Sequence, residues 1–122
     1  MASDSETQRL KIHELDRGIT HVVFKDANIL DEAVIQQIGD ELTAVIESSG
    51  NPKLLLDFTH VQHLSSAALG TLITVERKLR DQGGQLRLVH INKQIYEVFQ
   101  ITKLNKLFQI HDKEAKALKS FQ

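Results

Sequence analysis

The 122-residue chain contains no cysteine, no tryptophan and a single proline, and only 5% of its residues are aromatic. Without cysteine it cannot form disulfides, thiolate zinc sites, iron–sulfur clusters or a cysteine nucleophile. Long apolar runs are also missing, because runs such as Leu54–Leu56 fall far short of the ~20 residues that cross a bilayer. The polar N-terminal stretch has no apolar core of a signal peptide. We therefore expect a cytoplasmic protein that does not enter membranes.

Length and composition indicate a globular protein with a core built mainly from Leu, Ile and Val. Hydrophobic residues make up 41% of the chain and charged residues 25%, close to the average for globular domains. A chain of this length buries roughly two-thirds of its unfolded surface, enough to fold without disulfides or metals. We expect a single domain over residues 1–122, with a flexible tail at residues 1–8.

The charge is divided unevenly along the chain, although the net charge is only −1. Residues 1–50 carry ten acids and four bases, whereas residues 51–122 carry six acids and eleven bases. A basic half can indicate nucleic-acid binding. Here the basic residues are scattered among acids and are not interleaved with aromatics, so we interpret them as solvated surface and expect no nucleic-acid partner. No long exposed apolar stripe is evident, and a monomer or weak dimer is expected.

Periodic apolar residues predict four helices, over residues 31–47, 66–82, 93–102 and 112–119. Asp31 can cap the first helix and Asp112 the last, because both can accept hydrogen bonds from free backbone N–H groups. The first helix should end at Gly50–Pro52 and the second at Gly83-Gly84, since glycine and proline terminate helices.

Short apolar or alternating runs predict strands at residues 10–15, 20–24, 53–58, 85–91 and 107–110. The Asp16–Gly18 turn joins the first two into a hairpin, and Leu86, Leu88 and His90 share one side of the fourth. Strands that alternate with helices favour right-handed parallel crossovers. The predicted fold is α/β, with a mixed, mostly parallel sheet of four to five strands, an N-terminal hairpin and four flanking helices.

Sequence motifs of known enzyme classes are absent, including nucleophile elbows, phosphate-binding loops and the zinc-protease motif. Only two of the six histidines, His60 and His63, lie close together, in the loop after strand 53–58. With Asp57 as a third ligand they could hold a metal ion, although solvent-exposed loop histidines are the commoner arrangement. Gly83-Gly84 follows a helix and is interpreted as a helix stop, because an anion binds at helix N-termini. We predict no enzymatic activity and no cofactor.

Two adjacent serines, Ser65 and Ser66, stand at the start of the second helix, beyond the carboxyl end of the predicted central strand. Open α/β sheets place their sites at this edge. Either serine could simply cap the helix, contributing about 0.5–2 kcal/mol. A serine here could also accept a phosphate, because the free N–H groups and the positive end of the helix tolerate the added negative charge. A neutral, flat surface would then become bulky and anionic.

The order and spacing of motifs around these serines are specific. The matching positions are Asp57, Thr59, Val61, Ser66, Leu69-Gly70, Gly83-Gly84, residues 86–89 and residues 102–108. This pattern resembles the STAS family, typified by bacterial anti-sigma-factor antagonists. In that family an apolar strand ends in Asp-x-Ser/Thr-x-Val and a loop leads to Asp-Ser-Ser/Thr-Gly-Leu-Gly. The likeness extends over roughly residues 10–120 and is tightest from 54 to 110.

The resemblance implies a regulatory protein that binds an anti-sigma factor that is also a serine kinase. The kinase phosphorylates the motif serine, a phosphatase removes the phosphate, and the unphosphorylated form binds the kinase and frees the sigma factor. The phosphoacceptor corresponds to Ser66, with Ser65 as second choice. The docking surface implied in this way comprises Thr59, His60, His63, Ser65, Ser66, Ala67, Ala68 and Leu69.

Two departures from the family motif bear on recognition by a kinase. Ser65 replaces the motif aspartate and Ala68 replaces the motif glycine. The first change removes a carboxylate beside the acceptor, and the second adds a methyl group, so either could weaken recognition by a kinase. A constitutive STAS scaffold that is not phosphorylated is therefore the alternative interpretation.

Overall fold

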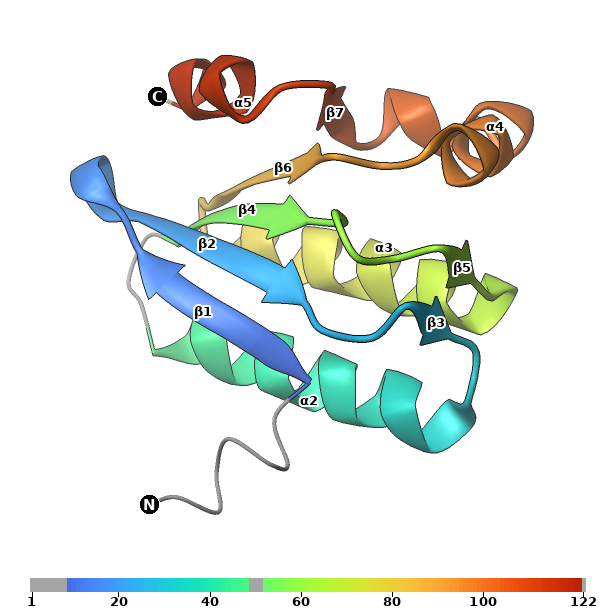
Figure 1. The fold of residues 1–122 in the computed structure, drawn as a ribbon. Helices are drawn as coiled ribbons and strands as arrows, with labels where there is room; N and C mark the ends of the chain where they lie inside the picture. The colour runs from blue at the N-terminus through green and yellow to red at the C-terminus, as the bar shows by residue number, and fades with distance from the viewer. Residues whose placement is uncertain (1–8, 49–51, 122) are drawn as a thin grey trace.

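The computed structural model describes residues 9–48 and 52–121. Strands and helices alternate along the chain, as predicted (Figure 1). The elements are β1 (Leu10–Glu14), the 3₁₀ turn η1 (Asp16–Gly18), β2 (Ile19–Phe24), β3 (Asn28–Ile29), α2 (Glu32–Glu47), β4 (Lys53–Asp57), β5 (His63–Leu64), α3 (Ser66–Asp81), β6 (Gln85–Val89), α4 (Lys93–Ile101), the 3₁₀ turn η2 (Leu104–Lys106), β7 (Gln109–His111) and α5 (Glu114–Ser120). The expected tail at 1–8 and the helix end at Gly50 and Asn51 lie outside the described residues.

A five-stranded sheet with the order β1-β2-β4-β6-β7 forms the centre of the fold. β1 and β2 pair antiparallel as the predicted hairpin, and the other neighbours pair parallel. The hairpin turn needs a left-handed backbone, with φ of 68° at Arg17 and 73° at Gly18. The predicted α/β fold, with its mixed and mostly parallel sheet, is confirmed.

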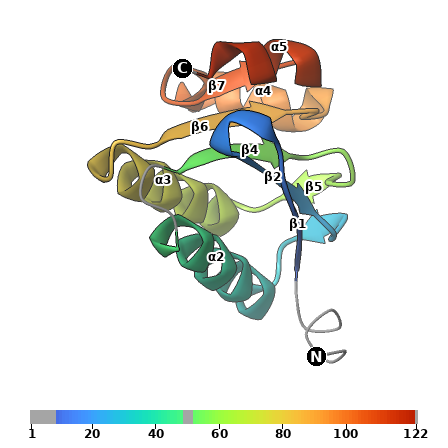
Figure 2. The same cartoon turned by 90° about the vertical axis from the view of Figure 1, so that its left-hand side faces the viewer.

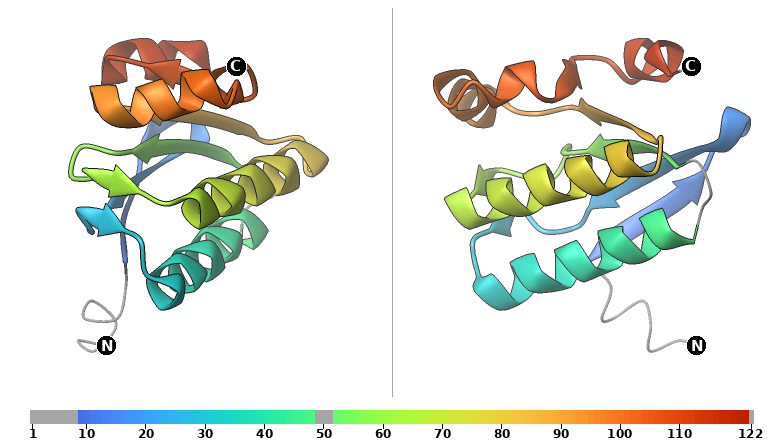
Figure 3. Two further views of the ribbon diagram at one scale, coloured as in Figure 1. Left: turned by 90° about the vertical axis from the view of Figure 1, so that its right-hand side faces the viewer. Right: turned by 180° about the vertical axis from the view of Figure 1, so that it is seen from behind.

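The sheet separates two apolar cores. α2 and α3 lie side by side against one face of the sheet, whereas α5 packs on the other face, where it contacts β6 and β7 (Figures 1, 2 and 3). β4 contributes side chains to both cores, because Leu54 and Leu56 point into the larger one and Leu55 points into the smaller one with Ala117 and Phe121. A strand buried on both faces requires a continuous apolar run, and this explains the sequence of β4.

Three local features differ from the sequence predictions. The last strand begins at Gln109 rather than Leu107, because η2 and the buried Phe108 occupy the preceding residues. The last helix is not capped by Asp112, since its N-cap position is Lys113 and no side chain bonds there. His90 does not continue β6: its backbone φ is 63°, and its ring contacts Asp57 instead of sharing a face with Leu88.

Within residues 9–48 and 52–121, every helix is too short or too polar to cross a bilayer.

Candidate functional site

The two serines at the start of α3 have different structural roles. Ser65 is the N-cap, with an extended backbone (φ −83°, ψ 167°), and its Oγ accepts a hydrogen bond from the backbone N–H of Ala68 at 3.2 Å. Ser66 is the first helical residue and is exposed. Of the two capping candidates in the sequence, the structure selects Ser65. Ser66 is thus left at the surface, where another protein can reach it.

Replacing Ser65 by alanine should destabilise the fold, because the Ala68 N–H loses its side-chain acceptor. We expect Ser65→Ala to lower the free energy of unfolding by about 1 kcal/mol. Ser66→Ala is the matched control and should change it by less than about 0.5 kcal/mol, since an exposed side chain is removed. Urea denaturation of the three proteins measures both values. Equal losses in the two variants would contradict the assignment of Ser65 as the cap.

A small second sheet holds the segment that leads into α3 in place. β3 and β5 pair in parallel, with Asn28 opposite His63 and Ile29 opposite Leu64. The Ser65 N–H donates to the Ile29 carbonyl at 3.1 Å and extends this pairing to the helix cap. The start of α3 is therefore held against the segment that leads into α2. A strand of two residues is too short to show a periodic pattern of apolar side chains, so the sequence predicted only a loop at His63 and Leu64.

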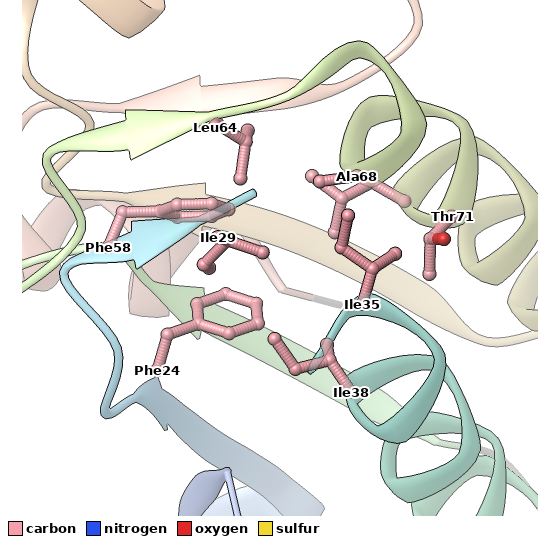
Figure 4. A pocket seen from close by; sticks show the side chains of 9 residues that line it. Phe24, Ile29, Ile35, Ile38, Phe58, Leu64, Ala68 and Thr71 are labelled. Carbon is pink, nitrogen blue, oxygen red and sulfur yellow. The ribbon is translucent and has the colours of Figure 1, made fainter. Parts of the chain in front are cut away.

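Apolar side chains line the space beneath the start of α3. Figure 4 shows a small cavity between the sheet, α2 and α3 whose labelled lining is carbon except for the Thr71 hydroxyl. Phe24 and Phe58 form part of the lining, with ring centroids 4.8 Å apart. Ala68 also faces this cavity and is 4% exposed, and Leu69 is 7% exposed. These two side chains belong to the core, so within the predicted docking surface they lie beneath the exposed residues.

The other predicted docking residues lie at or near the surface. Thr59, His60, His63, Ser66 and Ala67 are exposed and Ser65 is half-buried. They come from the loop after β4, from β5 and from the first turn of α3, all beyond the carboxyl end of β4.

Asp57, the last residue of β4, lies at the centre of a polar network that the sequence did not reveal. Its Oδ1 accepts hydrogen bonds from the Thr59 backbone N–H at 2.9 Å and the Thr59 hydroxyl at 2.5 Å. His90 Nδ1 lies 2.9 Å from Oδ1, and His21 Nε2 lies 2.9 Å from Oδ2. An ionised carboxylate only accepts hydrogen bonds, so both ring nitrogens donate to it. The network joins β2, β4 and the residue after β6.

These contacts keep Asp57 ionised even though it is 5% exposed. Burial by itself raises the pKa of a carboxyl group, because it disfavours the charged form. The hydrogen bonds from Thr59, His90 and His21 outweigh burial and lower the pKa of Asp57 to about 2. The carboxylate is therefore a fixed negative charge that orients the first residues of the loop leading to β5.

The sequence favoured exposed histidines over a metal site at His60 and His63, and both side chains are exposed. Among the described residues, the group with the spacing of a metal site is His21, Asp57 and Glu114, and it includes neither His60 nor His63. The Asp57 carboxylate points to His21 and His90, whereas His60 on the loop and His63 in β5 are exposed to solvent.

Comparison with known proteins supports the family indicated by the motifs. BtrV of Bordetella bronchiseptica, which carries the name anti-sigma factor antagonist, is 27% identical over 94 residues, 77% of this chain and 80% of BtrV. The crystal structure of an anti-sigma factor antagonist from Mycobacterium paratuberculosis matches with a TM-score of 0.79 and 21% identity, covering 92% of each chain.

Two structures of Bacillus SpoIIAA share the same fold. The phosphorylated form matches with a TM-score of 0.68 and 16% identity over 90% of this chain and 96% of that one. The unphosphorylated form has the same TM-score, with 17% identity over 90% and 94%. The family model of the STAS domain matches residues 12–117. The chain therefore belongs to the STAS domain family.

Proposed function

We propose that this chain is an anti-sigma-factor antagonist that binds an anti-sigma factor with serine kinase activity and is switched by phosphorylation of Ser66. The unphosphorylated form binds the kinase in the cytoplasm and releases a sigma factor, and a phosphatase restores that form. One observation carries the proposal: Ser66 is exposed at the first position of α3, beside a different serine that already caps the helix. Ser66 is therefore available for modification without loss of the cap.

The position of Ser66 favours a switch that leaves the fold intact. A phosphate adds a charge of about −1.5 to −2, and the N-terminal end of a helix stabilises negative charge. The phosphorylated and unphosphorylated forms of SpoIIAA match this chain with the same TM-score of 0.68. We therefore expect the phosphate to alter the surface that a partner meets rather than the packing of the core.

The shape of this surface also supports a docking role. Ser66, Ala67 and Gly70 are exposed on the first turns of α3 and have small side chains. A Cβ atom built on Gly70 meets nothing within 4 Å, so the space above it is open to a partner. Small residues let another backbone approach closely, and a bulky dianion in the middle of such a surface excludes it. His60 and His63 extend the surface on the β5 side.

Phosphate transfer to this chain tests the proposal directly. Incubation with the cognate kinase and ATP should add a single phosphate, which intact-mass analysis counts and peptide mapping locates on Ser66. Ser66→Ala should remove the modification, while Ser65→Ala, which removes only the cap, should retain it. Failure of the chain to bind any anti-sigma kinase, with or without phosphate, would refute the proposal.

A constitutive scaffold role is the second candidate, because Ser65 stands where the motif aspartate is expected. No carboxylate precedes Ser66, so a kinase that recognises the negative charge of the motif aspartate would phosphorylate this chain poorly. In this case the chain forms a partner complex that is indifferent to charge at position 66.

A further inference from the structure

Three side chains of types that can ligate a metal ion converge on the face of the sheet that α5 covers, opposite the face that α3 covers. They are His21 of β2, Asp57 at the end of β4 and Glu114 in the first turn of α5. The parallel register places Val23 beside Asp57 and His21 beside Leu55, so His21 and Asp57 share one face of the sheet as diagonal neighbours. α5 covers this face through Ala117 and brings Glu114 to the same place.

We propose that His21, Asp57 and Glu114 form a binding site for a divalent transition metal ion such as Zn²⁺. One imidazole nitrogen and two carboxylate oxygens are a donor set that zinc accepts, and water completes the coordination. Ligand atoms about 2.1 Å from a tetrahedral ion lie about 3.4 Å apart. In this structure the donor atoms all lie within 4.8 Å of one another, and His21 Nε2 is 2.9 Å from Asp57 Oδ2. Binding replaces the hydrogen bond between His21 Nε2 and Asp57 Oδ2 by bonds from both atoms to the ion, so Nε2 gives up its proton and the ring carries one on Nδ1 instead. Small side-chain shifts then bring the donor atoms to the required spacing.

The surroundings of Asp57 hold it as a ligand in a defined orientation. Thr59 donates to Oδ1 through both its backbone N–H and its hydroxyl, and His90 contacts the same oxygen. Oδ2 is thereby directed toward His21. Metal sites commonly orient their carboxylate ligands through such outer hydrogen bonds. The side chains of His21 and Asp57 are only 13% and 7% exposed, so bulk water competes weakly for the ion.

Of the three residues, Glu114 borders an open groove between the β1–β2 turn and α5, which Glu14 and Asp16 also line, and an ion would enter past it. Arg17 lies in the same groove, but its guanidinium donates to the Phe121 carbonyl at 2.8 Å, at the far end of α5. The carboxylates at the entrance attract cations. A bound ion would tie α5 to β2 and β4 and so stabilise the folded protein.

Zinc titration of the full chain tests the site. After treatment with EDTA and its removal, calorimetry should show one equivalent of Zn²⁺ bound, and the thermal unfolding midpoint should rise by about 10 °C at a free Zn²⁺ concentration 100 times Kd. Glu114→Gln removes one ligand from the surface of α5 without changing side-chain size. It should weaken binding at least about tenfold, as loss of even an outer-shell partner does.

His63→Ala is the matched control, because it removes an exposed histidine outside the site and should leave zinc binding unchanged. Circular dichroism verifies that Glu114→Gln remains folded. A folded Glu114→Gln that binds Zn²⁺ as tightly as the wild type would overturn the proposal, as would a wild type that binds none in the micromolar range. Loss of binding in His63→Ala alone would identify an adventitious surface site and would also overturn it. None of these results depends on the partner or on phosphorylation of Ser66.

Discussion

Ser66→Glu is expected to abolish the complex with the anti-sigma kinase while the protein remains folded. A glutamate in the first turn of α3 is compatible with the helix, because the helix N-terminus favours negative charge. At the docking surface, however, an unpaired carboxylate must lose its hydration when the partner binds, at a cost of several kcal/mol. We expect the affinity for the kinase to fall at least about 100-fold, equivalent to about 2.7 kcal/mol. Isothermal titration calorimetry with the purified kinase measures the change.

Two further variants at the same position separate charge from size. Ser66→Gln has nearly the shape of Ser66→Glu without its charge, so it should retain most of the affinity if charge operates the switch. Ser66→Ala should bind like the wild type and should become insensitive to ATP. Equal binding by wild type and Ser66→Glu would instead favour the constitutive scaffold. Equal loss in the Glu and Gln variants would show that bulk, and not charge, excludes the partner.

Much of the fold could be predicted because its largest elements carry strong local signals. α3 presents Leu69, Leu72, Val75 and Leu79 at helical spacing, and all four side chains are buried. The apolar run of β4 is buried on both faces, as a central strand requires. In these elements local preference and tertiary packing agree, so periodicity alone gives nearly correct boundaries.

Elements set by tertiary contacts could not be predicted in the same way. β3 and β5 exist because Asn28 and Ile29 meet His63 and Leu64, which lie far away in the sequence. His90 leaves the line of β6 with a left-handed backbone, and no local pattern indicates that its ring meets Asp57. The same applies to Glu114, which approaches His21 only once α5 covers the sheet.

The sequence did not show which of the two serines of the candidate site caps α3. The sequence located Ser65 and Ser66 at the start of a helix, yet a serine that caps and a serine that is displayed look alike in sequence. The two serines differ because the helix begins between them. Ser65 has an extended backbone and turns its Oγ toward the Ala68 N–H, whereas Ser66 is the first helical residue and is exposed. Cap geometry in three dimensions was needed to tell them apart.

Acid should destabilise the protein through Asp57, because the pKa of this carboxyl group is lower in the folded state than in the unfolded state. The folded-state pKa is about 2, against the ordinary value of 3.8 that applies when the chain is unfolded. The unfolded state therefore takes up a proton first as the pH falls. The stability that Asp57 contributes is complete above pH 3.8, declines below it and is lost as the pH falls through about 2. The difference between the two pKa values corresponds to about 2 kcal/mol.

Comparison of the wild type with Asp57→Asn isolates this contribution from that of other carboxyl groups. Asparagine preserves the shape of the side chain and accepts hydrogen bonds through its oxygen, but it does not titrate. Urea unfolding in EDTA at intervals from pH 5 to pH 1.5 should show the wild type losing about 2 kcal/mol more than Asp57→Asn over this range. Parallel losses in the two proteins would mean that the hydrogen bonds from Thr59, His90 and His21 do not hold the carboxylate ionised. The hydrogen bonds to the Asp57 carboxylate would then be no stronger than those to the neutral asparagine amide. The network would position the loop before β5 but would not stabilise the negative charge of Asp57.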